Sequence, residues 1–183
     1  MHVVTAMPQR DLATRADVAI LLQRFYGQVL DDDILAEPFT EIRLHGLDSH
    51  LPVMCDFWET VLFRAGVYRG RVVHAHEPVH GRHALTARHF VRWLERWNTA
   101  IDELYRGPVA EHAKTQAVRI ARAMHRRLTG TDSPELDGLV NQTTPPHPVP
   151  PAPRTPDHRT TQQDSSASMT ADTPNHHASP VRF

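Results

Sequence analysis

Histidines are concentrated in the middle of the chain, in a stretch with no helical or strand periodicity. The stretch covers residues 67–85, VYRGRVVHAHEPVHGRHAL, and contains two glycines and one proline, so we expect no more than one short helix or turn there. Its four histidines are His74, His76, His80 and His83. A neutral imidazole nitrogen is a common ligand of iron, zinc, copper and nickel. The stretch is therefore a candidate metal-ligating region.

Polar side chains also occur next to large apolar ones in the segments around this stretch. Tyr26 follows a phenylalanine, His50 precedes an apolar stripe, and Trp93 begins another. A buried polar atom without a partner costs about 1–3 kcal/mol, so such groups need something to pair with. A bound cofactor that requires both a ligand and hydrogen-bond donors would account for all of them together.

Composition excludes several classes of protein. The 183 residues carry 20 basic and 21 acidic side chains, so the net charge of −1 indicates neither a nucleic-acid partner nor an anionic membrane surface. The single Cys55 excludes an internal disulfide, a C-x-x-C zinc or redox site, and covalent haem attachment through C-x-x-C-H. No stretch is apolar enough for a membrane span or a secretory signal. We therefore expect a reduced, cytoplasmic protein.

Apolar residues recur at helical spacing in most of the first 130 residues. Thr14, or Asp11 one turn earlier, is expected to cap the first helix, and Thr86 a later one. No segment alternates in the way of a strand, so the predicted fold class is all-α. The helices are expected at 14–30, from about 50 to Gly66, from Thr86 to Gly107-Pro108, and at about 109–128.

The end of the chain has a different composition. Ten of the 15 prolines lie after Gly130, among Ser, Thr and His and with few large apolar residues. Such a segment buries too little apolar surface to offset the entropy of ordering, about 1–2 kcal/mol per residue. We expect one folded domain at 1–130 and a disordered tail at 131–183 whose removal leaves stability nearly unchanged. A role as a proline-rich ligand is the alternative for this tail.

Five motifs in order along residues 12–128 resemble those of group III truncated globins. The resemblance rests on matched spacing as well as on residue type. The motifs are FYGQV with Tyr26, EPF with Phe39, HLPVMCDFWETVL with His50 and Trp58, YRGRVVHAHEP with His76, and LTARHFVRWLERW with Trp93.

This resemblance implies a two-over-two helical sandwich that holds one non-covalent haem b. It implies His76 as the proximal ligand of the iron, Phe39 against the haem face, and Tyr26, His50 and Trp93 on the distal side. O2, CO, NO or peroxide would then be the small ligands, and a reductase the unidentified partner. Because distal donors slow the release of oxygen, sensing or peroxide and nitric oxide redox chemistry is favoured over transport.

Each of these residues also has a structural interpretation. His76 could be an exposed loop histidine, and a small shift of the motif would make His74 the ligand. Tyr26 and Trp93 could be ordinary core residues, and His50 a surface residue at the start of a helix. His80 and His83 are expected on the surface. Alternatively, either of them could lie near a carboxylate of the haem. Trp58, Trp97 and Cys55 are expected to fill the core.

Two other classes of function remain open at this point. The H-x-H and H-x3-H spacings of the four histidines are compatible with a transition-metal site without haem. A helical interaction module that recruits partners through the proline-rich tail is the other alternative. Colour separates them from a haem protein, which absorbs strongly in the visible and near-ultraviolet.

Overall fold

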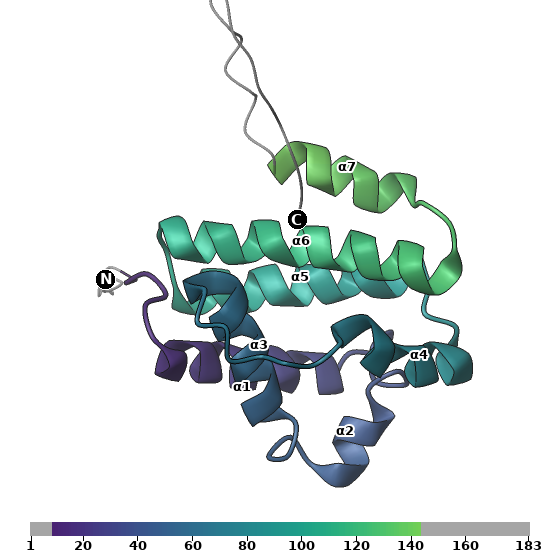
Figure 1. Cartoon of the computed structure of the whole chain (residues 1–183), viewed down its shortest axis with the longest axis horizontal. Helices are drawn as coiled ribbons and strands as arrows, with labels where there is room; N and C mark the ends of the chain where they lie inside the picture. The colour runs from purple at the N-terminus through teal and green to yellow at the C-terminus, as the bar shows by residue number, and fades with distance from the viewer. Residues whose placement is uncertain (1–8, 144–183) are drawn as a thin grey trace, which may run out of the picture. The chain divides into compact units, whose positions relative to one another are not determined.

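The structure, a computed structural model, describes residues 9–143, and this part of the chain contains helices and no strand (Figure 1). The all-α prediction is therefore confirmed for the described residues. Within them, no helix is both long and apolar enough to cross a bilayer. The helices are α1 (Arg15–Leu30), α2 (Thr40–His45), α3 (Leu51–Phe63), α4 (Val72–His83), α5 (Ala87–Leu104), α6 (Pro108–Thr129) and α7 (Pro134–Thr143).

Four helices form two packed layers. The neighbours α5 and α6 make one layer, while α1 and α3 make the other, with α1 against α5 and α3 against α6 (Figure 1). The buried face of α6 is a stripe of alanines, which lets the neighbouring backbones approach closely. Trp97 of α5 is fully buried there and donates its indole N–H to the Ala113 carbonyl at 3.3 Å. This arrangement is the two-over-two sandwich that the resemblance implies.

Two of the helix starts expected from the sequence are confirmed. Thr14 caps α1 by accepting the backbone N–H of Asp17, whose carboxylate accepts the Thr14 N–H in return. Thr86 caps α5 in the same reciprocal way with His89. α3 ends at Phe63, slightly before the expected Gly66.

A buried carboxylate fixes the end of α1 against α5. Asp32 accepts hydrogen bonds from Arg92 Nε and Arg96 Nε, both at 2.7 Å. Burial raises the pKa of Asp32, but the bonds from Arg96, from the Ile34 backbone and from Arg92 outweigh it, so its pKa lies below the ordinary value. Trp93 lies between the two arginines in the sequence of α5. The attachment to Asp32 therefore also sets the rotation of α5 about its axis, and with it the direction of the Trp93 indole.

The stretch at 67–85 differs from the expectation of a short helix or turn. It forms α4, a helix of 12 residues with Pro78 inside it, although a proline removes one helical hydrogen bond. None of its residues is buried. The inner face of α4 contributes to a pocket instead of the core, and this is why the apolar periodicity that marks the other helices is missing.

The folded part also extends beyond the expected boundary at residue 130. α7 packs against α5 and α6, and its Leu136 is completely buried. Ser133 accepts the Leu136 N–H at the start of α7, and Arg122 of α6 forms an ion pair with Asp137. The expectation of disorder was wrong for 134–143 because a few apolar residues are enough for a helix that packs on an existing core. Residues 144–183 lie outside the described residues, so the rest of the tail stays a prediction.

We expect Leu136→Ala to lower the free energy of unfolding by about 2–5 kcal/mol, because it leaves a cavity in a fully buried site. Denaturant unfolding followed by circular dichroism measures this. Leu44→Ala is the control, since Leu44 is 74% exposed. Truncation after residue 130 removes α7 and should lower the free energy of unfolding as well. Truncation after residue 146 keeps every described residue and is the matched comparison. Equal stability of Leu136→Ala and wild type would contradict the role given to α7.

Candidate functional site

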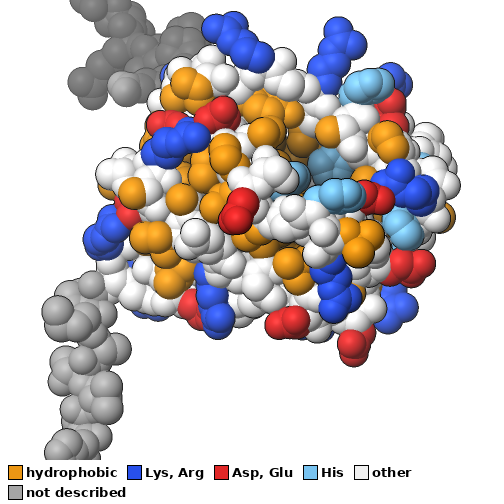
Figure 2. All heavy atoms as spheres, turned by 90° about the horizontal axis from the view of Figure 1, so that it is seen from below, with side chains coloured by type: hydrophobic (Ala, Val, Ile, Leu, Met, Phe, Trp, Pro, Cys, Tyr) orange, Lys and Arg blue, Asp and Glu red, His pale blue; other side chains and the backbone are white. Residues whose placement is uncertain are grey.

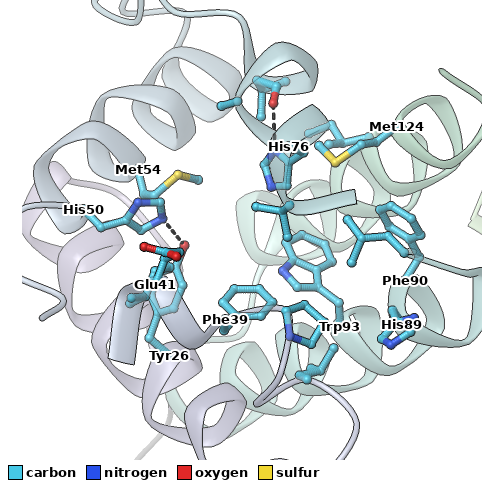
Figure 3. A pocket seen from close by; sticks show the side chains of 18 of the residues that line it. Tyr26, Phe39, Glu41, His50, Met54, His76, His89, Phe90, Trp93 and Met124 are labelled. Carbon is cyan, nitrogen blue, oxygen red and sulfur yellow. Dashed lines mark hydrogen bonds between the residues drawn. The ribbon is translucent and has the colours of Figure 1, made fainter. Parts of the chain in front are cut away.

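The five site residues predicted from the sequence line one cavity of about 400 Å³. Figure 3 shows them converging from α1, α4, α5 and the turns that precede α2 and α3. They are Tyr26, Phe39, His50, His76 and Trp93. The rest of the lining is mostly apolar, and Figure 2 shows a hollowed face with histidine side chains in and beside the hollow. The structure therefore brings together residues that are up to 67 positions apart.

His76 presents one ring nitrogen to this pocket. Its Nδ1 lies 2.7 Å from the backbone carbonyl of Val72, one turn earlier in α4. A carbonyl oxygen only accepts, so Nδ1–H is the donor and the neutral ring keeps a lone pair on Nε2. Figure 3 shows the ring directed into the pocket. This is the arrangement that orients a histidine as a metal ligand, with one nitrogen hydrogen-bonded and the other free to coordinate.

Tyr26 and His50 form a hydrogen-bonded pair on another wall of the pocket. The Tyr26 hydroxyl lies 2.8 Å from His50 Nε2 (Figure 3). Burial raises the pKa of Tyr26, with a smaller contribution from Cys55, so the phenol stays protonated. Burial also lowers the pKa of His50, and the nearby His76 adds to this shift. Both groups are therefore neutral near neutral pH, and either one can donate, depending on the tautomer of His50.

Aromatic rings support the pocket from the core side. Trp93 lies parallel to Trp97 at a centroid distance of 5.8 Å, and Trp97 stacks on Trp58 at 4.2 Å. Trp97 and Trp58 are buried, as expected, although Trp58 also reaches the pocket wall. Phe39 lies beside Tyr26 at 6.2 Å. Cys55 is buried next to this cluster, in agreement with its predicted role as a core residue.

The other three histidines of the central stretch do not join His76. His74 points away from the pocket with a side chain that is 75% exposed, and its Nδ1 lies 2.8 Å from Glu77. His80 and His83 are half-buried further along α4 and are not part of the pocket lining. Across residues 9–143, no three His, Cys, Asp or Glu side chains lie close enough to hold a metal ion.

Three polar residues of the pocket were missed by the sequence analysis. Glu41 and Arg82 come from α2 and α4, and His89 from the first turn of α5. His89 belongs to the LTARHF motif, so the motif contained a signal, but only Thr86 and Trp93 of that segment were given a role. Glu41 and Arg82 had no such signal because neither α2 nor the full length of α4 was expected.

Comparison with known protein families finds no match to this sequence, and comparison with curated proteins finds none either. Among solved structures, the crystal structure of group III truncated hemoglobin from Campylobacter jejuni is similar, with a TM-score of 0.59 and 20% identity. The similarity covers 66% of this chain and 94% of that chain. The fold is that of a truncated globin. At this level of identity the likeness is one of fold, and it agrees with the two packed helical layers.

We expect the protein to lose stability as the pH falls below about 6.5, the ordinary pKa of histidine. The native state holds His50 neutral, whereas the unfolded chain takes up the proton, so acid favours unfolding until the native ring is protonated. His50→Gln should show a weaker loss between about pH 7 and pH 5.5 in denaturant titrations. His112→Gln, which replaces an exposed histidine on α6, is the control. If the free energy of unfolding falls with pH as steeply in His50→Gln as in wild type, the His50 ring does not contribute to the acid sensitivity.

Proposed function

We propose that this protein binds one non-covalent haem b in the pocket and takes small diatomic ligands or peroxide there. The observation that supports this best is the fixed tautomer of His76, which leaves Nε2 as a free electron pair facing an apolar cavity. A neutral histidine nitrogen is the standard proximal ligand of a globin-type haem iron. When bound, the haem supplies an iron with one coordination position for His76 and one for the small ligand.

The remaining polar groups of the pocket suit the other side of such a cofactor. When His50 Nε2–H donates to the Tyr26 oxygen, the Tyr26 hydroxyl is free to donate into the pocket. Trp93 offers an indole N–H from the adjacent wall. In an apolar surrounding, such donors stabilise a ligand that carries partial negative charge more than a neutral one.

This polar wall favours a protein that retains its ligand over one that releases it readily. We therefore propose sensing, or redox chemistry on peroxide or nitric oxide with an external reductase, as the role instead of simple oxygen transport. The alternative of a histidine-rich metal protein without haem has no structural support in the described residues, because His74, His80 and His83 do not gather with His76.

We expect purified protein supplied with hemin to show an intense near-ultraviolet haem band in ferric and dithionite-reduced spectra. His76→Gly should lose the spectrum of a histidine-ligated iron and regain it when imidazole is added, because only the axial nitrogen has been removed. His74→Gly is the matched control, since it removes an exposed histidine from the same helix. A wild-type protein without a haem band would refute the proposed function, and loss of the band in His74→Gly alone would reassign the ligand.

We also expect Tyr26→Phe to release oxygen about 2- to 13-fold faster, which corresponds to the loss of one hydrogen bond of about 0.5–1.5 kcal/mol. Stopped-flow measurement of the dissociation rate tests this. Tyr105→Phe is the control, because Tyr105 is also buried but donates to the Asp17 carbonyl away from the pocket. Equal rates in wild type and Tyr26→Phe would mean that the hydroxyl donates to His50 and not to the ligand.

A further inference from the structure

Acidic and basic side chains face each other at one edge of the pocket. Arg82 Nη2 lies 3.8 Å from Glu41 Oε1, and this ion pair joins α4 to α2. One residue further along α4, His83 Nδ1 lies 3.5 Å from Glu37 Oε1. Glu41 and Arg82 line the pocket, and His89 lines it from the start of α5. A cavity that is otherwise mostly apolar therefore has one charged edge.

The basic side of this edge has unused hydrogen-bond capacity. The Thr86 backbone N–H donates to His89 Nδ1 at 3.1 Å, so a neutral His89 carries its proton on Nε2 and can donate it. Burial lowers the pKa of His89, as do Arg88 and His83, against an opposing effect of Glu37, so the ring is held in this neutral form. His83 Nδ1, which lies 3.5 Å from Glu37 Oε1, is buried and makes no hydrogen bond among the described residues.

The existing ion pair is one that a ligand can displace. The side chains of Arg82 and Glu41 are 48% and 53% exposed, and their separation is longer than a direct hydrogen bond. Exposed ion pairs of this kind contribute only about 0–1 kcal/mol. A carboxylate of a bound ligand could therefore replace that of Glu41 at little cost, and a guanidinium is well suited to bind it.

We propose that Arg82 and His89 bind the carboxylate groups at one edge of the pocket's ligand, and that Glu41 competes with that ligand for Arg82. The inference rests on the proposed function, since a haem is a flat apolar macrocycle with two carboxylates along one edge. Arg82 and His89 are positioning residues in this account, and Glu41 opposes binding. The two charged residues of one ion pair therefore have effects of opposite sign.

The test uses the full chain and compares the binding of porphyrins that carry two carboxylates with the binding of their uncharged esters. Binding of metal-free protoporphyrin IX and its dimethyl ester is measured by fluorescence, and that of hemin and its dimethyl ester by absorbance. Glu41→Gln should bind the diacids about two- to fivefold more tightly, and Arg82→Gln about two- to fivefold more weakly, with the esters unaffected by either change. Glu41→Gln should have no effect in an Arg82→Gln background.

The ion pair between Arg126 and Asp132 provides a matched control. Its separation of 3.9 Å and its exposure of 61% and 56% are close to those of the pair at the pocket, but it lies at the end of α6. Arg126→Gln and Asp132→Asn should leave all four affinities unchanged. Identical binding of acids and esters, or the same sign of effect for Glu41→Gln and Arg82→Gln, would overturn the inference while leaving haem binding intact. Failure of all four porphyrins to bind wild type would instead refute the proposed function.

Discussion

The hydrogen bond between His76 Nδ1 and the Val72 carbonyl is the interaction on which the site depends. It requires residues 72–76 to be a regular helical turn, because only then does the carbonyl lie beneath the ring. It also decides which nitrogen faces the pocket, and with it whether the ring offers an electron pair or a proton. A loop at this position would have left both choices open, so the ordering of α4 is part of the chemistry of the site.

The opposite wall of the pocket is held by the core itself. In the parallel stack of Trp93, Trp97 and Trp58, the two outer rings lie on the pocket wall and Trp97 is fully buried between them. The alanine stripe of α6 makes room for Trp97, and the Asp32 attachment sets the rotation of α5. Packing and electrostatics thus cooperate to place the Trp93 indole at the cavity. Tyr26 and His50 satisfy each other's polar groups until a ligand enters.

Sequence reasoning succeeded where a helix faces the core, since burial on one side produces the apolar repeat of α1, α3, α5 and α6. Capping residues also marked the starts of α1 and α5. It placed Tyr26, His50, His76 and Trp93 at one site through matched spacing. It could not find the full α4, whose inner face meets a cavity, nor α7, which depends on one buried leucine and a surface that already exists. Glu41 and Arg82 become neighbours only because α2 and the full length of α4 meet, so no local pattern could pair them.

The absence of buried residues in α4 has a thermodynamic consequence. A helix that contains Pro78 and has only partly buried residues, such as Val72 and Val79, gains less from packing than the other helices of the core, so we expect it in the part of the fold that opens at low free energy. A molecule that fills the cavity and contacts α4 binds only while this helix is folded. Its binding therefore raises the free energy of local opening of α4. Occupancy of the pocket and protection of the α4 backbone against amide exchange are therefore thermodynamically linked. Filling the pocket would slow amide hydrogen exchange along α4.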